Sequence, residues 1–285
     1  MSSNQSVKQT FQPPPNACDS HCHVFGPADR FPYSDVRKYT PKDAPKQELF
    51  ALHKKLGFER SVLVQASCHG TDNSAMLDMM KDAEGRYRGV AIIDENFDFN
   101  ELQSFHDAGV RGIRFNFLPR LVDVKPKDYY LKVADKVAQL GWHIVVYFES
   151  ENLINIENIL HDIPAPLVID HMGRPDVTQG LQSENFQRIC ELVKRRPDNF
   201  IKVSCVERLT KIGAPYSDVI PYAKYLVDHF SSQVLWGTDW PHPNMEPNIP
   251  DDVLLVNTIP LIATTAELQQ KLLVDNPHKL YQFGN

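Results

Sequence analysis

The segment PLVIDHM (166–172) joins a short β-branched apolar run to an aspartate and a histidine. Helix-like segments such as NSAMLDMMKDAEG and YLKVADKVAQLG separate runs of this kind, and several end in glycine or a basic cluster, as helices do. Strands that alternate with helices predict parallel strands joined by right-handed crossovers. Eight such runs predict the α/β class and a closed (β/α)₈ barrel, or TIM barrel. The other seven are ACDSHCHVF (17–25), SVLVQAS (61–67), RGVAIID (88–94), GIRFNF (112–117), HIVVYFE (143–149), FIKVSCV (200–206) and VLWGTDW (234–240).

The domain organisation follows from the same pattern. An open doubly wound sheet is the alternative fold, but no glycine-rich phosphate turn follows the first run. Barrels of about 250 residues commonly form one domain, and no linker divides this chain of 285 residues. We expect a mobile N-terminal tail over residues 1–16, followed by a single catalytic barrel domain over residues 17–285.

Composition and charge narrow the class of partner. The formal charge of −6 argues against nucleic acid and anionic membranes as partners, because both need a basic footprint. No signal-peptide core or transmembrane run is present, so we expect a cytoplasmic protein. The five cysteines are an odd number without zinc-cluster spacing, which favours reduced, partly buried thiols. Nothing in the sequence specifies an oligomeric state.

Chemically capable side chains follow three of the eight runs. His21 and His23 share one face of the first strand, His171 follows the sixth and Asp239 follows the eighth. Active sites of TIM barrels lie at the carboxyl ends of the strands. Structural packing alone does not readily explain four such side chains at the same end of the barrel, so we predict that all four are catalytic.

These residues also carry a family resemblance. A His-x-His after the first strand and an aspartate after the eighth resemble the amidohydrolase superfamily. The segments PPPNACDSHCHVFGPADRFPY, VQASCHGTDN, RGIRFNFLPRLVD, VIDHMGRPDV and WGTDWPHPNM closely resemble the 2-pyrone-4,6-dicarboxylate hydrolases, which are lactonases of bacterial lignin-derived aromatic breakdown. The resemblance runs from about residue 12 to the C-terminus. It implies hydrolysis of a planar, doubly carboxylated pyrone to 4-oxalomesaconate, with a small-molecule dicarboxylate lactone as substrate and no cofactor.

Whether a metal takes part is the main mechanistic question. The fourth run has no lysine, and His143 stands at the start of the fifth run, on the rim opposite the predicted site. We interpret His143 as structural, so a binuclear metal site lacks a ligand. His21, His23, His171 and Asp239 could still form a mononuclear zinc site. The missing ligand and the resemblance favour a metal-free site, in which Asp239 activates water and burial or coupling raises its pKa.

Arginines and polar groups complete the predicted pocket. Arg114 lies within an apolar run, where we disfavour an internal ion pair because Arg114 shares a face with Asn116 near the barrel mouth. Forked guanidinium groups suit carboxylates. The resemblance places a set of residues in substrate contact, and we add His69 because it should share a face with Ser67. The set is Tyr39, Ser67, Arg114, Arg120, Tyr147, Arg208 and Asn244.

Other chemistries fit less well. Cys22 and Cys68 alternate away from the predicted site residues, so packing explains them better than nucleophilic catalysis. No G-x-S-x-G segment is present, which disfavours a serine hydrolase of the α/β-hydrolase type. Two alternatives stay open: a mononuclear zinc or manganese hydrolase or decarboxylase acting on another acidic substrate, and a catalytically silent barrel that binds a dicarboxylate as a sensor or carrier.

Overall fold

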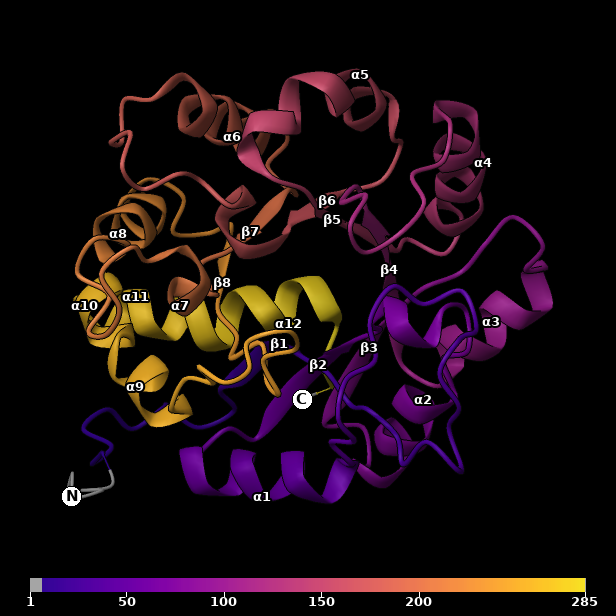
Figure 1. Cartoon of the computed structure of the whole chain (residues 1–285), viewed down its shortest axis with the longest axis horizontal. Coiled ribbons are helices and arrows are strands. Elements are labelled where there is room, and N and C mark those ends of the chain that lie inside the picture. The colour runs from indigo at the N-terminus through magenta and orange to yellow at the C-terminus, as the bar shows by residue number, and fades with distance from the viewer. Residues whose placement is uncertain (1–6, 285) are drawn as a thin grey trace.

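The computed structural model describes residues 7–284 and confirms the predicted barrel. One parallel sheet contains eight strands in the order in which they occur along the chain, as Figure 1 shows. A helix or short helical turn follows each strand. The strands are β1 (Cys18–Cys22), β2 (Arg60–Val64), β3 (Tyr87–Ala91), β4 (Val110–Asn116), β5 (His143–Tyr147), β6 (Leu167–Ile169), β7 (Phe200–Lys202) and β8 (Val234–Leu235).

The barrel closes between β1 and the segment that follows β8. The amide of Asp239 donates to the carbonyl of His21, and the amide of His23 donates to the carbonyl of Trp240, both at 2.8 Å. Gly237 permits this contact, because a Cβ atom there would lie 2.5 Å from the amide nitrogen of His21. Closure therefore carries Asp239 directly beside the two histidines of β1.

The helices surround the sheet and bury its outer face. A continuous apolar core lies between the two layers, and it includes Leu63, Ile113, Val146 and Ile201 from the strands. The crossover helices are α1 (Lys46–Leu56), α2 (Ser74–Asp82), α3 (Phe99–Asp107), α4 (Lys127–Ala138), α5 (Leu153–Asp162), α6 (Glu184–Lys194), α7 (Val206–Leu209) and α8 (Ile220–His229).

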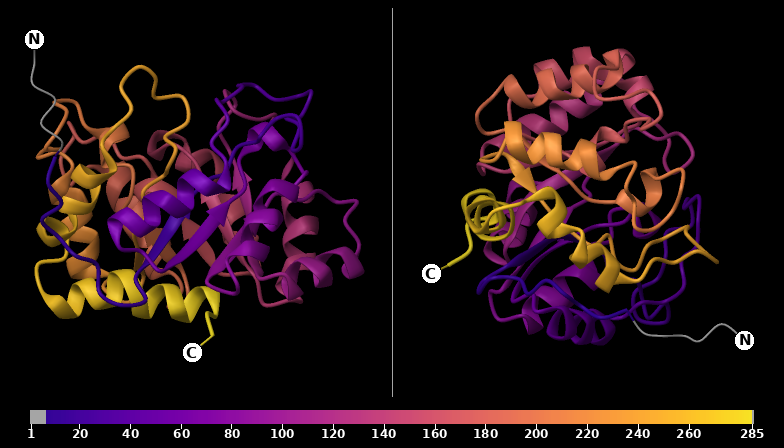
Figure 2. Two further views of the ribbon diagram at one scale, coloured as in Figure 1. Left: turned by 90° about the horizontal axis from the view of Figure 1, so that it is seen from below. Right: turned by 90° about the vertical axis from the view of Figure 1, so that its left-hand side faces the viewer.

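The C-terminal segment runs from the loop after β8 to the end of the barrel where the strands begin, and its last residues cover that end. It comprises α9 (Asp252–Asn257), α10 (Ile259–Ile262), α11 (Ala266–Gln270), a π-helical turn and α12 (Asn276–Tyr281). Figure 2 shows the yellow C-terminal helices across one end of the barrel, opposite the loop that follows β8. Tyr281 and Phe283 pack onto a small apolar cluster that includes Val145, Val168 and Phe200. This end is closed, so access to the interior is from the carboxyl ends of the strands.

The predicted tail lies partly outside the described residues, which begin at residue 7. Gln9 donates to the carbonyl of Leu56 at 2.8 Å, and Asn257 of α9 accepts from the amide of Thr10 at the same distance. Mobility of residues 1–16 stays a prediction. Among the described residues, no helix has both the length and the apolarity to cross a membrane. All five cysteines are free and buried.

Candidate active site

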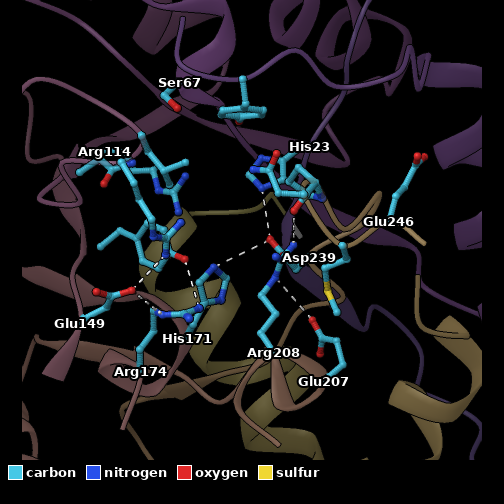
Figure 3. Close-up of a pocket in the computed structure, with 18 of the residues that line it drawn as sticks. His23, Ser67, Arg114, Glu149, His171, Arg174, Glu207, Arg208, Asp239 and Glu246 are labelled. Carbon is cyan, nitrogen blue, oxygen red and sulfur yellow. Dashed lines mark hydrogen bonds and ion pairs between the residues drawn. The ribbon is translucent and has the colours of Figure 1, made fainter. Parts of the chain in front are cut away.

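A cavity of about 510 Å³ opens at the carboxyl ends of the strands. Figure 3 shows Asp239 near its centre, with histidines and arginines around it. His21 is fully buried and lies one layer below the cavity, in contact with the ring of His171 at a centroid distance of 4.5 Å. Ten of the twelve predicted site residues line the cavity: His23, Tyr39, Ser67, Arg114, Arg120, Tyr147, His171, Arg208, Asp239 and Asn244.

Three imidazoles surround one carboxylate oxygen of Asp239. The Nε2 atoms of His23, His21 and His171 lie 3.2, 3.5 and 3.8 Å from Oδ1. All four side chains are at most 4% exposed. The structure therefore brings together the four groups that the strand ends predicted, in a water-poor environment where their mutual electrostatic effects are strong.

Backbone contacts fix the two histidines of β1. His23 Nδ1 lies 2.7 Å from the carbonyl of Val64, and since a carbonyl only accepts, this nitrogen carries a proton. The buried Asp19 accepts from the amide of His21 at 3.1 Å and from the Thr238 hydroxyl at 2.6 Å. Asp19 thus joins β1 to the segment after β8 and holds His21 near Asp239.

A strained turn presents His171. Residues His171, Met172, Gly173 and Arg174 all have positive φ, between 51° and 67°. Left-handed backbone is unfavourable for the three residues with a Cβ, so surrounding structure must enforce it. Ser204 contributes, because its hydroxyl lies 2.9 Å from His171 Nδ1. The turn directs the side chains of both His171 and Arg174 to the cavity.

Lys202 is a central residue that the sequence analysis missed. Its side chain is fully buried in β7, and Nζ lies 2.9 Å from His21 Nδ1 and 3.1 Å from Asp170 Oδ1. Asp170 Oδ1 also lies 3.2 Å from His21 Nδ1, but only the contact with Lys202 has hydrogen-bond geometry. A protonated lysine only donates, so His21 Nδ1 accepts and its proton stands on Nε2, which faces Asp239. Burial, followed by the charge of Lys202, lowers the pKa of His21 to about 3, which keeps His21 neutral. A lysine inside an apolar run was the signal that could have found it.

Asp170 is a second missed residue, and it corrects the interpretation of Arg114. Arg114 forms the internal ion pair that we had disfavoured, with Nη2 2.8 Å from Asp170 Oδ2, while still lining the cavity. Burial opposes ionisation of Asp170, but Lys202 and then His21 and Arg114 hold its pKa well below the usual range. Asp170 therefore serves as the shared counter-ion of the two buried cations.

The expected rise in the pKa of Asp239 is wrong in direction. Burial is the largest single effect and acts to raise the pKa, but the opposing effects together exceed it, and the largest of these comes from Arg208, whose Nε and Nη2 both lie 2.8 Å from Oδ2. The hydrogen bond with His23 adds to the effect, and the pKa is held well below its usual range. Asp239 is thus ionised at neutral pH, and its reactivity as a base depends on how it is partnered.

His69 does not line the cavity. Strand alternation was expected to place it beside Ser67, but Ser67–His69 form a 3₁₀ turn, in which alternation does not apply. Its Nδ1 lies 3.2 Å from the carbonyl of Pro32, and its ring packs 4.7 Å from the ring of Tyr33. Burial lowers its pKa, consistent with a neutral packed side chain.

The cavity also contains charged residues that the sequence analysis did not select. Glu149 lies 3.1 Å from Arg120 Nη2 and 3.7 Å from Arg174 Nε. Glu207 is 2% exposed, and within the described residues neither of its oxygens has a hydrogen-bond partner. Glu149 lies two residues after the end of β5, and Glu207 lies in the short helix α7 that follows β7, so their position after a strand was the available signal.

The donor set around Asp239 also fits a metal ion geometrically. A tetrahedral zinc site with bonds of about 2.0–2.1 Å separates its ligand atoms by roughly 3.3 Å. His23 and His21 lie 3.2 and 3.5 Å from Asp239 Oδ1, and the buried His21 Nε2 has no hydrogen-bond partner among the described residues. A proton on His21 Nε2, as the contact with Lys202 requires, would have to leave before this nitrogen could bind a metal.

The chain is similar to known proteins over most of its length. The amidohydrolase family matches residues 18–283. A Comamonas testosteroni protein described as 2-pyrone-4,6-dicarboxylate hydrolase is 51% identical, covering 96% of this chain and 92% of its own length. A 4-sulfomuconolactone hydrolase of Hydrogenophaga intermedia is 35% identical, covering 95% and 90%. A solved structure of a probable 2-pyrone-4,6-dicarboxylic acid hydrolase from Acinetobacter baumannii, with citric acid bound, has 26% identity and a TM-score of 0.82, covering 94% and 100%.

Proposed function

Because the chain belongs to the amidohydrolase family, we propose that it is a lactonase that hydrolyses 2-pyrone-4,6-dicarboxylate to 4-oxalomesaconate without a metal. The observation that carries the proposal is the convergence of three imidazoles on Asp239 inside an arginine-walled cavity. The 51% identical relative is described as a 2-pyrone-4,6-dicarboxylate hydrolase. The relative bound to citric acid supports a pocket for carboxylates.

Asp239 acts as the base in the proposed reaction. It takes a proton from water as the water oxygen attacks the lactone carbonyl carbon, and the ring carbon–oxygen bond then breaks. This proton passes to the departing enolate oxygen, and the new carboxylic acid releases its remaining proton to solvent, which leaves a carboxylate on an open-chain enol. An enolate is a good leaving group, so a base with a low pKa suffices for an ester where it would not for an amide.

The histidines stabilise the developing oxyanion. His21 directs an Nε2 proton towards the site because Lys202 occupies its Nδ1. His171 directs its Nε2 atom to the same point, and a fixed donor in a buried site stabilises a tetrahedral intermediate strongly. His23 directs Nε2 to this point as well, but it donates from there only when the ring is doubly protonated, because its Nδ1 already donates to Val64. Arg208, Arg114 and Arg120 hold the carboxylates, assisted by Tyr39, Ser67, Tyr147 and Asn244.

The alternative function is a mononuclear metal-dependent hydrolase or decarboxylase on another acidic substrate. His21, His23, His171 and Asp239 would hold the ion, which would polarise a carbonyl and supply hydroxide at neutral pH. The proton on His21 Nε2 opposes this arrangement. Lys202 therefore supports the metal-free proposal through the chemistry of the donor set.

One experiment separates these possibilities. Purified protein is treated with chelator, analysed for metals, and assayed for loss of the pyrone absorbance in the ultraviolet. We expect full turnover in metal-free protein. Activity that disappears with the metal and returns with zinc or manganese would establish the alternative, and tight binding without turnover of any lactone would indicate a sensor or carrier.

A further inference from the structure

The acidic residue Glu149 is shared by two arginines of the cavity. It accepts from Arg120 Nη2 at 3.1 Å and lies 3.7 Å from Arg174 Nε. The other two cavity arginines each pair with a buried carboxylate: Arg114 with Asp170, which also contacts Lys202, and Arg208 with Asp239. One carboxylate for two guanidinium groups leaves a net positive charge on this wall.

Arg174 is held in place but poorly satisfied. Its side chain is 19% exposed, its Nε has no hydrogen-bond partner among the described residues, and its Nη1 reaches the hydroxyl of Tyr147 only at 3.4 Å. Its backbone lies in the strained left-handed turn that also presents His171. Strain of this kind persists where function maintains it. Buried donors without acceptors favour a ligand that supplies them.

The position of Glu149 and Arg174 in the cavity indicates which part of the substrate they would contact. Figure 3 shows Glu149 and Arg174 beside His171, on the side away from Arg208 and Glu207. A planar substrate with its reacting carbonyl at Asp239 can therefore direct one carboxylate to Arg208 and another to the Arg174 side. Glu149 is 31% exposed, so its ion pairs are weaker than the buried ones and exchange more readily.

We infer that Arg174 is a specificity-determining residue that binds one carboxylate of the substrate together with Arg120, and that Glu149 is the counter-ion this carboxylate displaces. The inference rests on the proposed function. It predicts effects of opposite sign, because Arg174 attracts the substrate carboxylate and Glu149 competes with it. A purely structural pair would weaken binding when either residue is changed.

The kinetic test uses Arg174→Met, Arg174→Lys and Glu149→Gln with 2-pyrone-4,6-dicarboxylate. Loss of a charged hydrogen bond predicts a KM raised roughly ten- to hundred-fold in Arg174→Met, with kcat little changed and partial rescue in Arg174→Lys. Glu149→Gln is expected to lower KM about two- to five-fold. Arg188→Met is the matched control, because Arg188 pairs with Glu184 and Glu157 on helices outside the cavity.

A binding test separates this inference from the proposed reaction. Calorimetry with isophthalate, a planar dianion without a lactone, measures the subsite even if wild-type protein hydrolyses no pyrone. We expect Arg174→Met to weaken isophthalate binding but to leave benzoate, which has one carboxylate, within two-fold. Equal losses for both ligands, or a weaker affinity in Glu149→Gln, would overturn the inference.

Discussion

The two ends of the barrel interior differ sharply in composition. At the closed end, the strands direct Val62, Val90, Val145 and other apolar residues onto Tyr281. Towards the open end, β7 carries the buried Lys202, and the buried Asp170 directly follows β6. Apolar packing needs only shape and volume, whereas each buried charge needs a partner. The closed end therefore stabilises the fold, whereas the buried charges of the open end lower the free energy of unfolding and provide the groups for catalysis.

Replacing Asp239 tests the open end most directly. Asp239→Asn keeps the size of the side chain but removes the proton acceptor, so we expect kcat to fall by about 10²–10⁴. Steady-state hydrolysis of the pyrone measures it. Asp198→Asn is the control, since Asp198 forms an ion pair with Arg196 away from the cavity. Turnover near the wild-type value would exclude Asp239 as the base.

Lys202 tests how strongly the buried charges depend on one another. Lys202→Met leaves Asp170 with Arg114 as its remaining cation, and removing one member of a buried ion pair typically costs about 3–5 kcal/mol. Urea denaturation measures the free energy of unfolding. Lys132→Met, at a lysine 61% exposed, is expected to change it by less than about 0.5 kcal/mol. Similar small losses in both variants would mean that Asp170 does not need Lys202.

Arg208 affects the pH at which Asp239 becomes protonated. The base form of Asp239 is lost as pH falls through its pKa, which Arg208 holds well below the usual range. Arg208→Gln should raise that pKa, so the acid limb of kcat/KM moves to higher pH, and kcat/KM itself falls roughly tenfold through the lost carboxylate contact. Arg120→Gln removes a cation that does not contact Asp239, so its acid limb should stay in place. An unmoved limb in both variants would assign the limb to another group.

The architecture was predictable because its signals are local. Each strand is a short β-branched run, and the alternation with helices leaves few topologies. Strand ends then identified His21, His23, His171 and Asp239, since the barrel brings all strand ends to one rim. Period-two alternation failed for His69, where the chain had already left the strand for a 3₁₀ turn.

The electrostatic partners were harder to predict. That Arg114 pairs with Asp170, and Arg208 with Asp239, depends on distances between strands that the sequence does not specify. The direction of the Asp239 pKa shift follows from such pairings, because Arg208 and the surrounding histidines together outweigh burial. Lys202 carried a usable signal, a cation in an apolar run, but its partner His21 lies 181 residues away.

His143 gives the smallest expected effect and the sharpest control for the comparison. It begins β5, packs against the ring of Tyr281 at 5.2 Å, and does not line the cavity. His143→Leu should leave kcat and KM within about two-fold, since no step needs this ring.

Burial, and then the charge of Lys202, lowers the pKa of His143 to about 3, so His143 is neutral in the folded protein. An unfolded histidine binds a proton below about pH 6.5. Its contribution to stability is therefore lost as pH falls from about 6.5 towards 3. The free energy of unfolding, measured in urea at pH 7 and pH 5, should fall less between these values in His143→Leu than in wild type. An equal fall in both proteins would show that His143 does not carry this pH dependence.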